Sequence, residues 1–155
     1  MATIRLNTFI TAEPVRCFDL SISVDVHTSS TARSGERAIA GVRSGVMALN
    51  DEVTWEARHL RRAWRFTSRI VEYRSPELFT DEMRSGPFHH WRHAHKFVAV
   101  SGVTNMIDDV DFAPPFGPVG VMVDALFLRR YMSRLLGTRN KYIKDAAEAS
   151  QRCPS

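Results

Sequence analysis

Five consecutive segments of alternating apolar and polar residues constrain the fold of this chain more than any other feature. Such alternation is typical of β-strands that bury one face, because successive side chains of a strand point to opposite sides of the sheet. Short polar, proline or glycine runs separate the segments, and connections this short favour antiparallel neighbours. The five segments are residues 53–59, 63–73, 78–84, 86–97 and 103–112.

Two further strands and a short helical segment are predicted before this sheet. Residues 4–10 alternate in the same way, and residues 37–46 are predicted to form another strand. Between them, Pro14 is expected to lie in the first turn of a helix, where proline is tolerated, with Thr11 as the cap. The polar and β-branched residues that follow predict that this helix is short and broken and that residues 28–31 form a loop.

The C-terminal part of the chain has a helical pattern. Apolar residues recur at three- and four-residue spacing over residues 118–149, and the late arginines, Arg139 among them, are expected to form a solvated face. These elements predict an α+β fold. A curved antiparallel sheet of six to seven strands wraps around the long C-terminal helix and leaves a cavity between them. We expect residues 1–150 to form this single domain and residues 151–155 to form a flexible C-terminal tail.

Charge and cysteine usage exclude several classes of protein. The formal net charge of +4 is spread over 155 residues without a run of five like charges, so no nucleic-acid partner is expected. No apolar stretch is long enough for a membrane span, and stable membrane insertion is not expected. Cys17 and Cys153 form no C-x-x-C spacing and fit a reducing compartment. We expect a cytoplasmic protein that is a monomer or a homodimer.

The segment of residues 86–97, GPFHHWRHAHKF, places histidines on the inner face of the sheet. Its outer face carries Arg92 and Lys96, which are seldom buried. Imidazoles turned inward cost free energy unless they find partners. The expected partners on neighbouring strands are Asp81, Asp108 and His59. The inner face is predicted to carry Trp91, His93, His95 and Phe97.

His93 and His95 have three interpretations. The H-x-H spacing is found in zinc sites, with Asp81 or His59 as a third ligand, but no matched spacing supports it, so no metal or other cofactor is expected. Asp81 could instead orient one histidine as the general base for an enolisable, polyketide-like substrate. The remaining interpretation is a hydrogen-bond network that satisfies itself and shapes a pocket.

A family pattern is spread over much of the chain. It consists of Phe79, Asp81, Glu82, Gly86, Pro87, Phe88, Trp91, His93, His95, Phe97, Asp108, Pro115, Gly117, Arg139 and Asn140. With this pattern and its order of elements, the chain resembles the SRPBCC superfamily, which has a START-like, helix-grip fold, and within it the small bacterial cyclase-like proteins. One departure is His59-Leu60-Arg61, where the family commonly has H-F-G. Without that glycine, the pattern does not predict whether a turn or a bulge forms here. The resemblance implies a hydrophobic ligand cavity and says little about chemistry.

We therefore expect a carrier or sensor that binds a hydrophobic small molecule, either lipid-like or polycyclic aromatic, in an internal cavity. The alternative is a cyclase/dehydratase-like enzyme, a lyase or isomerase, with His93, His95 and Asp81 as its catalytic residues. Inward aromatic residues could stack on an aromatic ligand or simply form the core. The predicted ligand-binding residues are Trp55, His59, Phe66, Ser68, Phe79, Asp81, Trp91, His93, His95, Met106, Asp108, Met122 and Leu126.

Overall fold

The computed structural model describes the backbone of residues 1–114 and 121–149, and the side chains of residues 1–114 and 125–149. Within these ranges, seven strands form one antiparallel sheet in the order β1-β7-β6-β5-β4-β3-β2. The strands are β1 (Ala2–Ile10), β2 (Arg37–Gly41), β3 (Glu52–His59), β4 (Arg62–Arg74), β5 (Leu78–Ser85), β6 (His90–Val100) and β7 (Val103–Ala113). The helices are α1 (Pro14–Ser21), α2 (Val24–Ser30), the 3-10 turn η1 (Ala32–Ser34) and α3 (Val121–Ala149).

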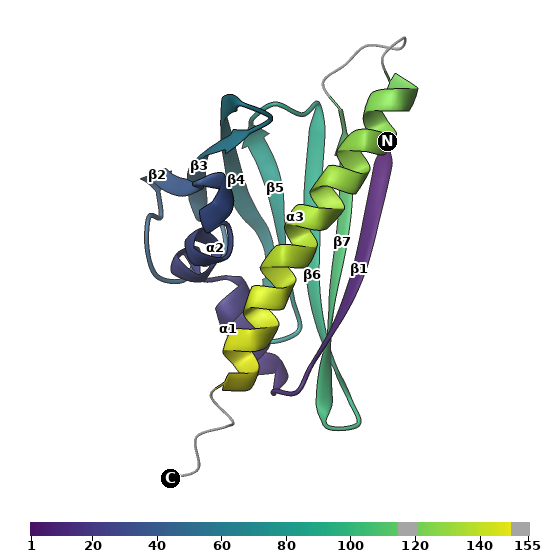
Figure 1. Ribbon diagram of the computed structural model, residues 1–155. Coiled ribbons are helices and arrows are strands. Elements are labelled where there is room, and N and C mark those ends of the chain that lie inside the picture. Colours follow the sequence, from purple (N-terminus) through teal and green to yellow (C-terminus); the bar gives the residue numbers. More distant parts are fainter. Residues whose placement is uncertain (115–120, 150–155) are drawn as a thin grey trace.

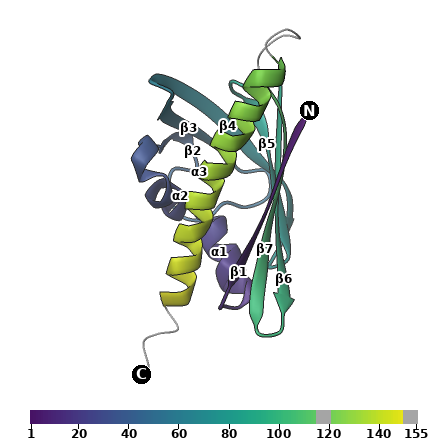
Figure 2. The ribbon, with the colours of Figure 1, turned by 45° about the vertical axis from the view of Figure 1, so that its right-hand side comes forward.

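The sheet curls around α3, as two views of the ribbon show (Figures 1 and 2). Helices α1 and α2 lie against the C-terminal half of α3 (Figure 1). The predicted α+β, helix-grip architecture is confirmed, including the short helical segment after the first strand. None of the helices in the described ranges has the length and apolar character that a membrane crossing requires.

The predicted alternation is confirmed in β7, and the predicted inner face of β6 is confirmed as well. On the predicted outer faces, Thr80 of β5 and Ala94 of β6 are buried too. In β7, every second residue from Thr104 to Phe112 is buried, and the residues between them are partly exposed. In β6, Trp91, His93 and His95 are buried, and the register places His95 beside Asp108 of β7. The inner face of the sheet therefore carries the histidines that the sequence pattern assigned to it.

Two-residue turns close two of the hairpins. Ser101 and Gly102 join β6 to β7, and Leu60 and Arg61 join β3 to β4, with positive φ at all four residues. A pair of left-handed residues is what a type I′ hairpin turn requires, because its twist matches that of the flanking strands. The departure His59-Leu60-Arg61 thus leaves the turn tight, although neither turn residue is a glycine.

Three local predictions were wrong. The N-terminal cap of α1 is Glu13 without a side-chain hydrogen bond, and the backbone N–H of Thr11 instead donates to Glu148. The predicted loop at residues 28–31 is mostly helix α2, because Ser23 caps it and the hydroxyls of its last turn donate to carbonyls within the helix. Strand β2 ends at Gly41 instead of residue 46, after a bulge in its pairing with β3.

Candidate functional site

A cavity of about 290 Å³ lies between the inner face of the sheet and α3. Its lining is mainly apolar and aromatic, and all three tryptophans of the chain take part in it. From α3, it is lined by residues at helical spacing, namely Leu128, Tyr131, Met132, Leu135, Leu136 and Arg139. Of the predicted ligand-binding residues, the structure brings together around the cavity Trp55, His59, Phe66, Ser68, Phe79, Asp81, Trp91, His93 and His95.

Three predicted residues do not line this cavity. Leu126 is 52% exposed, because two residues along a helix turn the side chain by about 200°, which places Leu126 opposite Leu128. Met106 is fully buried beneath α1, where Ser21 Oγ lies 3.4 Å from its sulfur. Asp108 is also fully buried, behind the two histidines. The side chain of Met122 lies outside the described residues.

Asp108 is the centre of a buried polar network behind the cavity wall. Its Oδ1 lies 2.8 Å from Nε2 of His93, and its Oδ2 accepts a hydrogen bond from the Asn140 amide at 2.6 Å. Nδ1 of His95 is 3.1 Å from Oδ1 but is not aligned for a hydrogen bond. Burial alone would favour the protonated acid, yet the neighbouring His93 and His95 hold the pKa of Asp108 well below its ordinary range. Asp108 is therefore a buried carboxylate.

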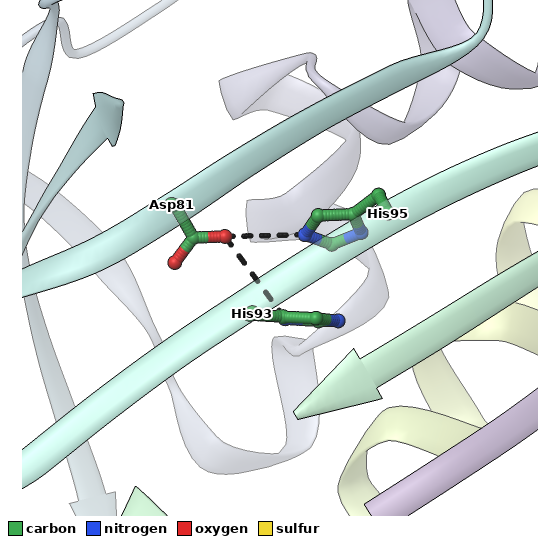
Figure 3. Close-up of side chains that lie close together, drawn as sticks. All are labelled: Asp81, His93 and His95. Atoms are coloured by element: carbon green, nitrogen blue, oxygen red, sulfur yellow. Dashed lines mark hydrogen bonds and ion pairs between the residues drawn. The ribbon is translucent and has the colours of Figure 1, made fainter. Parts of the chain in front are cut away.

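Asp81, His93 and His95 form the polar wall of the cavity itself (Figure 3). Asp81 Oδ2 lies 3.1 Å from Nε2 of His95 and 4.0 Å from Nδ1 of His93, so the predicted contact between Asp81 and a histidine of the next strand is present. The His95 ring stacks on Phe79 with centroids 4.1 Å apart. Although burial opposes its ionisation, Asp81 has a lowered pKa because of its hydrogen bond with His95 and the nearby His93.

The protonation of His93 follows from its surroundings. Burial, together with the neighbouring His95, lowers the pKa of His93 despite the two carboxylates. A neutral imidazole whose Nε2–H donates to Asp108 carries its lone pair on Nδ1. That lone pair faces the cavity wall beside Asp81, so His93 can accept a proton or a hydrogen bond there.

The same three residues have the composition of a metal site. One ligand atom from each of Asp81, His93 and His95 lies within 4.8 Å of the others. Of the two residues predicted as a possible third ligand, Asp81 lies beside the H-x-H pair and His59 does not. Two imidazoles and a carboxylate could hold a divalent transition metal, with Asp108 as the outer partner of the histidines.

Arg139 was wrongly assigned to a solvated face. It is 5% exposed, donates to the carbonyl of Ser21 at 3.1 Å, and has Nη1 3.6 Å from Asp108 Oδ1. The helical spacing contained the signal, since Arg139 follows Leu135 and Leu136 by four and three residues and so lies on their face. Arg139 is therefore a buried cationic neighbour of Asp108.

A second polar cluster lines the cavity, and sequence reasoning missed most of it. His59, expected beside His93 and His95, instead lies next to Glu36, with Nε2 3.3 Å from Oε1. His27 Nε2 lies 2.6 Å from the other oxygen of Glu36, and Tyr131 lies 3.0 Å from Nδ1 of His59. His27 belongs to α2, His59 to β3 and Tyr131 to α3, and Glu36 lies just before β2. No local pattern in the sequence relates these four residues.

No protein-family model matches the chain, and no curated protein matches it. Solved structures do match. Protein TTHA0849 from Thermus thermophilus has a TM-score of 0.78 and 12% identity, with 96% of this chain and 99% of that chain covered. The Zhui aromatase/cyclase from Streptomyces sp. R1128 has a TM-score of 0.77 and 10% identity, with 98% and 96% covered. Ginseng major latex-like protein 151 from Panax ginseng has a TM-score of 0.65 and 12% identity, with 94% and 97% covered. These likenesses show a shared fold.

Proposed function

We propose that this chain, which has the helix-grip fold of the SRPBCC proteins, is a carrier or sensor that binds a hydrophobic small molecule in its cavity. The cavity is the observation that carries the proposal. A pre-formed cavity of about 290 Å³ that is mostly apolar, with a few polar groups in defined places, is the usual form of a small-molecule site.

The aromatic lining favours a flat, aromatic ligand over a flexible acyl chain. Phe66 and Trp91 meet edge to face with centroids 5.7 Å apart, and Trp55 lines the cavity as well. Rigid rings offer large contact surfaces to other aromatic rings and lose little conformational entropy when they bind. The polar wall of Asp81 and His93 then gives an oriented ligand a place for one hydrogen-bonding group.

We expect the cavity to be blocked when Ala57 is replaced by phenylalanine. Ala57 lies on the inner face of β3 and lines the cavity, so a larger ring there occupies ligand space. The affinity for 4-hydroxybiphenyl, measured by tryptophan fluorescence, should fall by at least about fivefold, because overpacking costs more than about 1 kcal/mol. The matched control is Arg58→Phe, which adds the same ring at the neighbouring exposed position. Equal affinities of the two variants would contradict the proposal.

A cyclase/dehydratase-like enzyme is the second candidate. The lone pair of His93 beside Asp81 at the cavity wall favours it, as does the fold shared with the Zhui aromatase/cyclase. Such an enzyme would use His93 as a general base that removes a proton next to a ketone, with His95 and Asp81 beside it.

The exchange of a ketone's α-hydrogens with solvent separates the carrier from the enzyme. For a carrier, we expect the protein to leave unchanged the rate at which 2-tetralone exchanges its α-hydrogens in D₂O, followed by NMR. Replacing His93 by alanine should then change only the affinity for the ketone. Acceleration by the natural protein that His93→Ala abolishes, at nearly unchanged affinity, would favour the enzyme.

A further inference from the structure

The cavity has a second polar cluster, which neither the carrier nor the enzyme candidate uses. It consists of His27, Glu36, His59 and Tyr131, and all four line the same cavity as Asp81 and His93. Glu36 has a side chain that is mostly buried, and it lies between two imidazoles at 2.6 Å and 3.3 Å. The Trp55 ring packs on His27 with centroids 4.2 Å apart.

The hydrogen bonds of this cluster have a direction. A carboxylate can only accept, so His27 and His59 each direct Nε2–H toward Glu36. Although burial opposes it, these two histidines lower the pKa of Glu36 to about 2, so it is ionised at neutral pH. In neutral His59 the lone pair is then on Nδ1, which accepts the O–H of Tyr131 at 3.0 Å.

This direction leaves the oxygen of Tyr131 available to a ligand. Its proton is directed to His59, its hydrogen-bond partner among the described residues, so the phenol oxygen can accept one more hydrogen bond. Tyr131 lines the cavity, and the group that fits its oxygen is a donor such as a ligand hydroxyl. His59 and Glu36 act through Tyr131 and are positioning residues.

Tyr131 and the polar wall of Asp81 and His93 lie at separate levels of the cavity. Tyr131 and Arg139 both line it, and eight residues of helix separate them by about 12 Å along α3. Arg139 lies beside Asp108, directly behind His93. The stretch of α3 between the two levels lines the cavity with apolar side chains, among them Met132, Leu135 and Leu136.

We propose that Tyr131, oriented by His59 and Glu36, is a second hydrogen-bonding site of the cavity, and that the ligand is a rigid aromatic molecule with a hydroxyl group at each end. One hydroxyl donates to Tyr131, and the other donates to His93 or Asp81 at the far level of the cavity. This inference rests on the proposed function, because it concerns a ligand in the same cavity.

A matched series of probes tests it: biphenyl, 4-hydroxybiphenyl and 4,4′-dihydroxybiphenyl, with affinities measured by calorimetry on the full chain. The variant Tyr131→Phe should weaken the dihydroxy compound by about tenfold, the value of one good hydrogen bond. Biphenyl should be unaffected. The monohydroxy compound should lose only about twofold, since it can still bind in the reverse orientation, toward His93.

The control is Tyr142→Phe, the same change at an exposed position of α3, which should leave all three affinities unchanged. A uniform loss for all three probes in Tyr131→Phe would mean a merely structural role for the tyrosine and would overturn the inference. So would an unchanged affinity for the dihydroxy compound. If biphenyl and both phenols fail to bind the natural protein, the proposed function itself fails, and the inference fails with it.

Discussion

Replacing Asp108 by alanine is expected to lower the free energy of unfolding by about 3–5 kcal/mol, the cost of removing one partner from a buried charged network. His93 and Asn140 both lose their bonds to this carboxylate. Arg139, which is also buried, loses its nearest counter-charge at 3.6 Å. Urea unfolding at pH 7, followed by circular dichroism, measures the change.

The adjacent residue provides a matched control. Asp109 is on the opposite face of β7, where its carboxylate is partly exposed and pairs with Lys96 at 2.8 Å and with Arg5 at 3.5 Å. Asp109→Ala should cost less than about 1 kcal/mol, as is usual for surface ion pairs. If the two alanine variants unfold at the same urea concentration, Asp108 does not hold the network together. Asp108→Asn keeps the volume and one acceptor and should lie between them.

The natural protein is expected to lose up to about 3 kcal/mol of stability through Glu36 alone as the pH falls from 4.5 to 2. The ordinary pKa of a glutamate is 4.5, and in the fold the pKa of Glu36 is lowered to about 2, because the bonds from His27 and His59 outweigh burial. A lowered folded-state pKa means that the stabilisation is complete above the unfolded pKa. It disappears as the pH falls through the folded pKa.

Glu36→Gln isolates this contribution from other acidic groups. Asp81 and Asp108 also have lowered pKa values, so the natural protein and the variant both lose stability in acid. The difference in unfolding free energy between the two proteins should be largest near pH 5 and should shrink toward pH 2. We would measure it by thermal unfolding at half-unit pH steps. A difference that stays constant over this range would show that the Glu36 carboxylate has an ordinary pKa in the fold.

Several features of the site were predictable because they depend on local periodicity. Which face of a strand points inward repeats every second residue, and the Arg92/Lys96 face marked the solvent side of β6. This placed His93 and His95 on the cavity wall. On a helix, the same reasoning works only if the position of each residue around the helix axis is known accurately. Leu126 and Arg139 were both assigned to the wrong side of α3, and counting their spacing from Leu128 or Leu135 corrects both.

The second polar cluster could not be predicted from local pattern. Glu36 lies between η1 and β2, His27 was expected in a short, broken helix, and Tyr131 is one of many polar residues of α3. Each residue taken alone is compatible with an exposed position. Only the curl of the sheet brings α2, β3 and α3 together at the cavity, and this curvature is a property of the whole sheet and not of any one segment.

The sequence by itself determined the order of strands and helices and the inward face of the sheet, because turn residues and side-chain alternation act over a few neighbouring residues. Tertiary structure alone decided which polar groups from distant segments meet. Asp108 and Asn140 are 32 residues apart, and His59 and Tyr131 are 72 apart. The physical reason is that a buried carboxylate must be satisfied by groups within hydrogen-bond reach, and that reach is set by the closed fold and not by distance along the chain.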